Sequence, residues 1–171
     1  MGSTHKKLGK MADNNEKKSK VFGKLAKLIQ TESKKAGGNI DSPGLKAAIE
    51  KARKENMPND NIERAIKKTD GMEMHTVMYE AYGPGGVGLI ITGLTDNTNR
   101  TSQELKHLFS LHEANLGGAG SVAWNFTKTA DGAWESNMKT ALADADAEKL
   151  SALVEALEER DDVQDVYTSA E

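Results

Sequence analysis

The 171-residue sequence contains no cysteine. A disulfide framework is therefore excluded, and so are metal sites built on thiolates and catalysis by a cysteine nucleophile. Of the four histidines, His107 and His112 are five residues apart on one expected helix, so their side chains point to different sides of it. No carboxylate completes a tetrahedral ligand set around them. The sequence predicts neither a metal site nor a cofactor.

Long hydrophobic runs are also absent. No apolar stretch approaches the roughly 20 residues that a membrane-spanning helix requires, and the lysine-rich N-terminal segment lacks the apolar stretch of a secretory signal. We therefore expect a protein that does not associate with membranes and resides in the cytoplasm.

Motifs of common enzyme classes are missing as well. The sequence has no Walker loop and no Ser in a G-x-S-x-G context. The paired acids Asp144 with Asp146, and Asp161 with Asp162, fall at expected helix ends, where capping and solvation explain them without acid–base catalysis. The sequence predicts a protein that is not an enzyme.

One glycine-rich segment, "GPGGVG" (Gly83 to Gly88), has the G-x-G-x-x-G spacing of a dinucleotide-binding loop. That loop binds phosphate only where the glycines lead from a strand into a helix. Here "LIITGL" follows, which is typical of a strand, and Pro84 beside Gly85 and Gly86 favours a turn. We interpret the segment as the turn of a hairpin.

Charge divides the chain into two parts of opposite sign. Residues 1–70 carry 17 Lys and Arg against 9 Asp and Glu, a net of +8, whereas residues 71–171 carry 6 against 17, a net of −11. Such asymmetry favours a basic module for a polyanion joined to an acidic module, although the two halves could also simply attract each other. We expect a basic helical domain over 1–72 and an acidic domain over 73–171.

The basic part has the periodicity of three helices. Apolar residues at helical spacing predict the first over 17–36. The second is expected to start at Ser42 and Pro43 and to end before Pro58, and the third to be capped by Asp60, with Gly71 beyond its end. The positions expected to form the core are Val21, Phe22, Leu25, Leu28, Ile29, Leu45, Ala48, Ile49, Ala52, Ile62, Ala65 and Ile66.

The acidic part alternates between strand and helix patterns. Strands are expected over 77–82, 87–94, 121–126 and 163–168, with a further one at "TALAD" (140–144). Thr101 is expected to cap a helix that "LGG" closes at Gly117, and Asp144 or Asp146 to cap the last helix. The order predicts an α+β fold, a mostly antiparallel sheet with helices on one face.

Two tryptophans are candidates for stacking on bases. Trp124 shares its expected strand face with Val122 and Phe126, so core packing is the favoured interpretation. For Trp134, which follows a turn, packing and stacking stay open. RNA-recognition strand motifs and zinc-finger spacings are absent.

Lysines are the clearest functional signal. Ten of them lie between Lys6 and Lys35, and Lys67 and Lys68 follow the third helix. A solvated helix face explains part of this density, but so many cations without matching acids favour contact with phosphate groups.

Five ordered segments resemble the YebC/PmpR family. They are "NMPNDNIERAIKK" (56–68), "YEAYGPGGVGLII" (79–91), "LTDNTNRT" (94–101), "NLGGAGSVAWNF" (115–126) and "LVEALEERDDVQDVY" (153–167), and "KSKVFGKLAKLI" is similar to the family's basic first helix. The resemblance implies a non-enzymatic DNA-binding transcriptional regulator, or a translational activator that acts at the ribosome, with a helical N-terminal domain followed by α+β domains.

Two features depart from the family pattern. "STHKKLGKMADNN" replaces the usual "GHSKW…KHRK" opening, which puts contacts made there in doubt. Family members also insert a third, ferredoxin-like domain where this chain has only residues 127–139. The resemblance therefore implies a minimal form, in which 127–139 is a short connector.

The expected partner is DNA or ribosomal RNA, bound through its backbone, with a protein partner on the acidic domain. By position within the resemblance, the expected nucleic-acid-binding residues are Lys17, Lys18, Lys20, Lys24, Lys27, Lys34, Lys35, Lys67, Lys68 and Arg100. For Arg100, a structural contact at the start of a helix is an equally open interpretation. The alternative function is a protein-interaction adaptor whose basic half docks an acidic protein.

Overall fold

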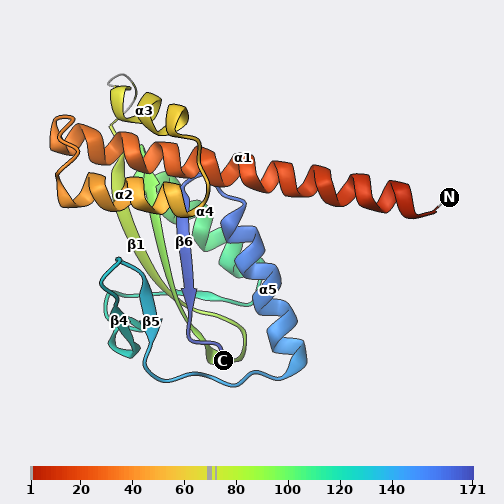
Figure 1. Ribbon diagram of the computed structural model, residues 1–171. Coiled ribbons are helices and arrows are strands. Elements are labelled where there is room, and N and C mark those ends of the chain that lie inside the picture. Colours follow the sequence, from red (N-terminus) through yellow and green to blue (C-terminus); the bar gives the residue numbers. More distant parts are fainter. Residues whose placement is uncertain (1, 69–70, 72) are drawn as a thin grey trace. The chain divides into compact units, whose positions relative to one another are not determined.

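The computed structural model describes residues 2–68, 71 and 73–171, with side chains from Lys17 onward (Figure 1). The side chains of Lys6, Lys7 and Lys10 lie outside the described residues. The chain divides into two compact units, Met1–Gly71 and Met72–Glu171, which we call the helical unit and the sheet unit.

Three helices form the helical unit: α1 (Gly2–Ala36), α2 (Pro43–Lys54) and α3 (Asn59–Lys67). The first helix ends where predicted but begins earlier, and its N-terminal part extends beyond α2 and α3 (Figure 1). Its apolar side packs into a common core with the other two. The fully or nearly fully buried residues of this core are Leu25, Ile29, Leu45, Ala48, Ile49, Ala52, Met57, Ile62 and Ala65, which includes eight of the positions predicted from periodicity. Val21 is 38% exposed, so its predicted place in the core is wrong.

The sheet unit combines six strands, two longer helices and two short 3-10 turns. In chain order these are β1 (His75–Tyr82), η1 (Pro84–Gly86), β2 (Gly88–Thr95), α4 (Thr98–Leu111), β3 (Asn115–Gly117), η2 (Ala123–Asn125), β4 (Phe126–Lys128), β5 (Trp134–Ser136), α5 (Asp144–Glu158) and β6 (Val163–Thr168). Four strands form an antiparallel sheet in the order β3-β1-β2-β6, and β4 pairs with β5 in a separate hairpin. The predicted α+β class is confirmed.

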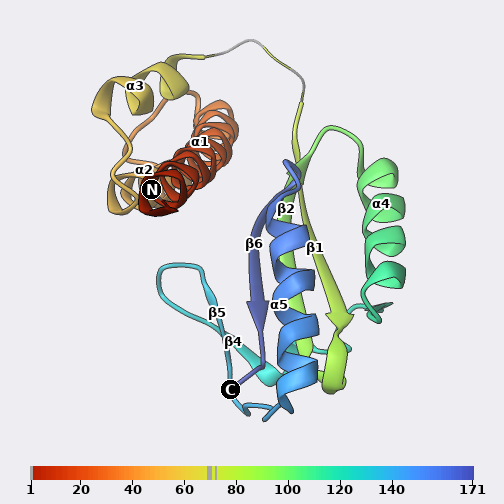
Figure 2. The same cartoon turned by 90° about the vertical axis from the view of Figure 1, so that its right-hand side faces the viewer.

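The two faces of the four-stranded sheet are covered differently (Figure 2). On one face, Leu89 and Ile91 of β2 pack with Leu105 and Phe109 of α4 and with the leucines of α5. On the other, Ile90 packs with Val122 and Phe126, and Trp134 of the hairpin and Tyr167 add to this smaller cluster. Helices therefore cover one face, as predicted, while the hairpin covers part of the other.

The glycine-rich segment forms the predicted turn. β1 and β2 pair along their full length, and the 3-10 turn η1 joins them. Gly85 has a φ of 72°, a conformation that favours glycine, and β2 rather than a helix follows the loop. The loop therefore lacks the helix N-terminus that a dinucleotide site needs.

Several predicted helix starts are wrong. Pro58 rather than Asp60 precedes α3, and Ala143 rather than Asp144 or Asp146 precedes α5. These three acids lie in the first turn instead, where a carboxylate still interacts favourably with the helix dipole. Ser42 does precede α2, but its side chain makes no capping hydrogen bond.

The segment 112–126 also differs from its prediction. The fourth helix ends at Leu111, and residues 115–117 form β3 instead of continuing the helix to Gly117. The strand expected over 121–126 is absent, because residues 123–125 form a 3-10 turn and β4 begins only at Phe126. Trp124 is consequently 66% exposed, so its predicted place in the core is wrong. The strand expected at 140–144 is reduced to one bridge between Thr140 and Ala170.

A buried carboxylate explains the geometry of this segment. Glu80 of β1 is only 6% exposed, and its side chain accepts hydrogen bonds from the backbone N–H groups of Gly120 at 2.6 Å, Val122 at 3.1 Å and Ala123 at 2.6 Å. Burial alone would raise the pKa of Glu80, but the three backbone donors outweigh it and hold this pKa below its usual value. With its N–H groups engaged in this way, the loop cannot pair as a strand.

We expect Gly93→Ala to destabilise the sheet unit by about 1–3 kcal/mol. Gly93 lies at the irregularity in the β2–β6 pairing, and a Cβ atom there would lie 2.4 Å from the backbone oxygen of Asp162. Both tryptophans of the chain belong to the sheet unit, so denaturant unfolding followed by tryptophan fluorescence reports on this unit. Gly118→Ala, where an added Cβ meets nothing within 4 Å, is the control. Equal midpoints for the two variants would contradict the prediction.

Candidate nucleic-acid interface

Five lysines of α1 recur along one side of the helix. They are separated by three, four, three and seven residues and are Lys17, Lys20, Lys24, Lys27 and Lys34. At about 3.6 residues per turn, these intervals bring each side chain back to the same side. We call these five residues the lysine stripe. It is interrupted only at Thr31, and at 1.5 Å per residue it is about 26 Å long.

The apolar core fixes the direction of the stripe within the helical unit. Leu25 and Ile29 are 3% and 0% exposed and pack against α2 and α3. On a helical projection Leu25 and Ile29 lie opposite the stripe, so the stripe points away from this core. Thr31, which interrupts the stripe, is only 6% exposed. Lys17, Lys20 and Lys34 are exposed, while Lys24 and Lys27 are partly buried.

Lys18 does not belong to the stripe. It lies one turn before Phe22, on the side of α1 that carries the core residues, and it is exposed there. The structure therefore places one predicted binding residue on a different side of the same helix.

The remaining predicted lysines gather at the C-terminal end of α1. Ser33 Oγ donates a 2.8 Å hydrogen bond to the backbone oxygen of Ile66, which fixes the end of α3 against the end of α1. Lys34 Nζ lies 3.5 Å from the backbone oxygen of Gly71. This arrangement brings the exposed Lys67 and Lys68 to the end of α1 that bears Lys34 and Lys35.

Lys35 has an acidic neighbour at this end. Glu32 lies 3.5 Å from the ammonium group of Lys35, whose side chain is 55% exposed. Because the Lys35 side chain is largely exposed to solvent, this pair contributes little to stability.

The site prediction omitted further cations of the helical unit. They lie on α2 and α3 and are Lys46, Lys51, Arg53, Lys54 and Arg64. All except Lys46 are in the last turns of their helices, where a cation interacts favourably with the helix dipole by about 0.3–1 kcal/mol. The +8 charge of residues 1–70 was the only sequence signal that pointed to them.

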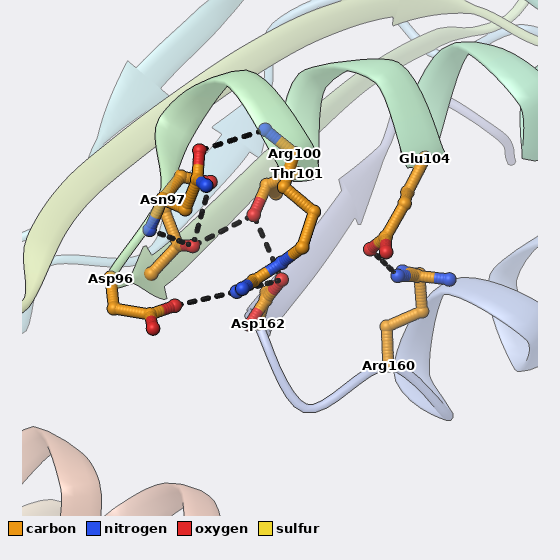
Figure 3. A network of polar contacts seen from close by, with 8 residues as sticks. Asp96, Asn97, Arg100, Thr101, Glu104, Arg160 and Asp162 are labelled. Atoms are coloured by element: carbon orange, nitrogen blue, oxygen red, sulfur yellow. Dashed lines mark hydrogen bonds and ion pairs between the residues drawn. The ribbon is translucent and has the colours of Figure 1, made fainter.

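Arg100 lies in the sheet unit, at the start of α4, and is held by carboxylates (Figure 3). Its Nη2 atom is 2.5 Å from Asp96 Oδ1 and 3.8 Å from Asp162 Oδ2. The hydrogen bond to Asp96 raises the pKa of the guanidinium. A phosphate at Arg100 would have to compete with both carboxylates. This favours a structural contact at the start of α4 over nucleic-acid binding for Arg100, and the candidate interface consists of the lysines.

The same network explains why the predicted cap of α4 is wrong (Figure 3). Asn97 is the cap, and its Oδ1 accepts the N–H of Arg100 at 3.0 Å. Thr101, the predicted cap, is buried, and its Oγ1 lies 2.8 Å from both Thr95 Oγ1 and Asp162 Oδ2. Arg160 pairs with Glu104 nearby. These contacts fasten the start of α4 to the loop before β6, and they are structural rather than catalytic in character.

A groove between α2 and α3 is a concave feature of the helical unit. It has a volume of about 590 Å³ and an apolar floor that includes Ile49, Ile62 and Ile66. Lys46, Arg53 and Lys67 on its rim are matched by Asp41, Glu50 and Glu63. The described residues contain no group of three or more His, Asp or Glu side chains that could hold a metal ion. Within the part of the chain that the structure describes, no helix is long and apolar enough to cross a membrane.

Two family models match the sequence. One describes the TACO1/YebC protein N-terminal domain and matches residues 4–72, and the other describes the TACO1/YebC second and third domain and matches residues 74–131.

Curated relatives and one solved structure extend the match. A probable transcriptional regulatory protein of Thermotoga petrophila is 49% identical over 72% of this chain and 49% of its own length. The corresponding protein of Thermosipho africanus is 34% identical over 94% of this chain and 88% of its own. The crystal structure of the conserved hypothetical protein Aq1575 from Aquifex aeolicus covers 90% of both chains with a TM-score of 0.76 and 29% identity.

The relatives are longer than this chain, which spans about half the length of the first curated relatives that it matches. The alignment with the Thermosipho africanus protein runs over 223 positions, although this chain has 171 residues, so part of that relative has no counterpart here. That the missing part is a third domain inserted at 127–139 stays a prediction.

Proposed function

The chain belongs to the TACO1/YebC family, and on this basis we propose that it is a regulator of gene expression whose helical unit binds the backbone of a nucleic acid. The observation that carries the proposal is the lysine stripe of α1, continued at one end by Lys35, Lys67 and Lys68. Curated relatives are named as probable transcriptional regulatory proteins, and not as enzymes.

Lysine suits contact with the phosphate backbone rather than with base edges. Its ammonium group is a compact point charge, whereas arginine, asparagine and glutamine supply the bidentate contacts that read bases. Only Arg53 and Arg64 are arginines among the 17 cations of residues 1–70. Backbone contacts give affinity and set the orientation of the polymer without reading its sequence.

This surface chemistry accepts DNA and structured RNA alike. Because the sequence of residues 1–70 shows no set of Arg, Asn and Gln along one helix face for major-groove reading, we favour RNA of the ribosome over a specific DNA operator. Co-sedimentation with ribosomes, measured beside a DNA mobility shift at equal salt, separates the two targets. Preferential retention on DNA would favour the transcriptional role that the relatives' names carry.

The sheet unit is assigned a different role. Residues 71–171 carry 17 acids and 6 cations, and such a surface repels a polyanion over most of its extent. We propose that it faces a protein partner within a larger cytoplasmic assembly.

We expect the affinity for nucleic acid to depend steeply on salt. If roughly five to eight lysines engage phosphates, the logarithm of the binding constant falls against the logarithm of salt concentration with a slope of about −4 to −7 on duplex DNA. Fluorescence anisotropy of a labelled duplex, titrated at several salt concentrations, measures this slope. A slope near zero would end the proposal.

The alternative is a protein-interaction adaptor whose helical unit docks an acidic protein. It predicts that exchanging Lys17 and Lys20 for glutamate leaves retention on nucleic acid unchanged while it abolishes one protein contact. Loss of retention in that variant, with the helix content measured by circular dichroism unchanged, excludes the adaptor.

A further inference from the structure

Two aromatic side chains of the sheet unit, Trp124 and Tyr82, are exposed to solvent. Trp124 is 66% exposed and Tyr82 is 43% exposed. The Nε1 atom of Trp124 and the hydroxyl of Tyr82 both donate to the backbone oxygen of Ser121, each at 2.9 Å. One carbonyl group therefore holds the polar ends of the two rings close together, and the ring surfaces are what they present to a ligand.

The protein fixes this pair before any ligand arrives. The carboxylate of Glu80 holds the backbone of Gly120, Val122 and Ala123, which directly precede Trp124. On the other side, the side chain of Asn125 accepts the N–H of Met138 at 2.8 Å and donates to its carbonyl oxygen at 2.9 Å. A ring held in this way loses little conformational freedom on binding, which favours affinity.

The charge around the pair differs from that of the rest of the sheet unit. Residues 114–130 contain no acid, and Glu80 is the only acid between residues 74 and 95. The charge of Glu80 is buried and satisfied by three backbone donors. The two segments that carry the rings are therefore free of exposed acids on a unit with a net charge of −11, which lowers the repulsion of a polyanion by these segments.

The backbone beside the rings leaves room for a planar ligand. A Cβ atom added at Gly118 or Gly120 would meet nothing within 4 Å. Because the indole N–H and the phenol hydroxyl already have a partner, recognition would depend on stacking rather than on hydrogen bonds from the rings. Stacking on an aromatic side chain tolerates any base but requires that the base be unpaired.

We propose that Trp124, with Tyr82 beside it, is a stacking site for an unpaired nucleobase. The inference rests on the proposed function and deepens it, because it specifies that the nucleic acid is engaged at a single-stranded or looped segment of RNA. A regular duplex, whose bases are stacked inside the helix, would contact only the lysines.

The test uses the full chain and two labelled RNA probes of about twelve nucleotides, one unstructured and one duplex. Fluorescence anisotropy at fixed salt gives the affinity of each. Trp124→Ala is expected to weaken binding of the unstructured probe roughly 5- to 100-fold, from the usual range of base stacking energies, and to change the duplex affinity less than about twofold. Trp124→Phe, which keeps an aromatic ring, is expected to retain most of the affinity.

Two controls make the result specific. Leu111→Ala removes an apolar side chain that is 65% exposed, elsewhere on the same unit, and is expected to change neither affinity. In a Trp134→Phe background Trp124 is the only tryptophan, and its fluorescence is expected to be quenched by the unstructured probe and not by the duplex.

The possible failures are distinguishable. If Trp124→Ala leaves both affinities unchanged, or lowers both equally, the stacking site is refuted while the lysine-based function stands. If the wild-type protein binds neither probe, both proposals fall. If Trp124→Ala removes only a protein contact, the surface is a protein interface and the inference is wrong.

Discussion

Replacing the first four lysines of the stripe with glutamine is expected to weaken binding to RNA or DNA roughly 10²- to 10³-fold at about 0.1 M salt. The four residues are Lys17, Lys20, Lys24 and Lys27, spaced so that all lie on one side of α1. Each ammonium group that meets a phosphate releases about one condensed counterion, and that entropy gain is the main source of affinity. The salt slope is expected to become shallower by about 0.9 for each ammonium–phosphate pair that the substitutions remove.

Two double variants, each with two lysines replaced by glutamine, provide the matched comparison. Lys24→Gln with Lys27→Gln removes two charges from the stripe and is expected to cost about 10- to 100-fold. Lys106→Gln with Lys149→Gln removes the same charge from the sheet unit, where Lys149 already pairs with Glu113 at 2.8 Å, and is expected to change affinity less than about twofold. Equal losses in the two pairs would show that only net charge matters and would remove the stripe from the interface.

Replacing Glu80 with alanine is expected to destabilise the sheet unit by about 3–5 kcal/mol. The change leaves the backbone N–H groups of Gly120, Val122 and Ala123 without their charged acceptor. Hydrogen bonds to a charged group contribute about 1.5–3 kcal/mol each, and partial hydration of the relaxed loop reduces the sum. Denaturant unfolding followed by tryptophan fluorescence measures the loss.

Two variants locate the cause. Glu80→Gln keeps one acceptor oxygen and is expected to lose about half as much as the alanine variant. Glu135→Ala removes an exposed acid from the same unit and is expected to change stability by less than about 0.5 kcal/mol. A Glu80→Ala variant as stable as Glu135→Ala would contradict the role given to Glu80.

The pKa of Glu80 adds a pH signature. Because its pKa in the folded protein lies below the ordinary value of 4.5, the folded state binds this proton less readily than the unfolded state does. The stabilisation is therefore complete above about pH 4.5 and is lost as the pH falls through the folded pKa. Stability curves of wild type and Glu80→Gln are expected to converge on acidification, and curves that stay parallel would argue against the ionised carboxylate.

Periodicity predicted most of the helical unit, because its information is local. Apolar residues at helical spacing, such as Leu25 and Ile29, identified the core. The binding residues were predicted by residue type, and Lys18 shows why this is insufficient. It is one residue after Lys17 of the stripe, and this places it on the core side of the helix.

The predicted cap of α4 shows where local pattern is ambiguous. Asn97 and Thr101 both precede a run with helical periodicity, and both side chains can accept a backbone N–H. The hydroxyl of Thr101 instead meets Asp162, a residue 61 positions later, and this leaves Asn97 as the cap. Arg100, between them, pairs with Asp96, four residues earlier, and with Asp162, which only the fold brings near.

The sequence alone determined the class of fold, the family and the turn at Gly83 to Gly88, because each follows from local spacing or from ordered local motifs. Only the tertiary structure decided that Trp124 stands on the surface. Glu80, about 40 residues earlier in the chain, takes the backbone donors that a strand over 121–126 would need. A side chain that takes backbone N–H groups from a segment about 40 residues away cannot be detected in the local periodicity of that segment. Here it left Trp124 exposed beside Tyr82.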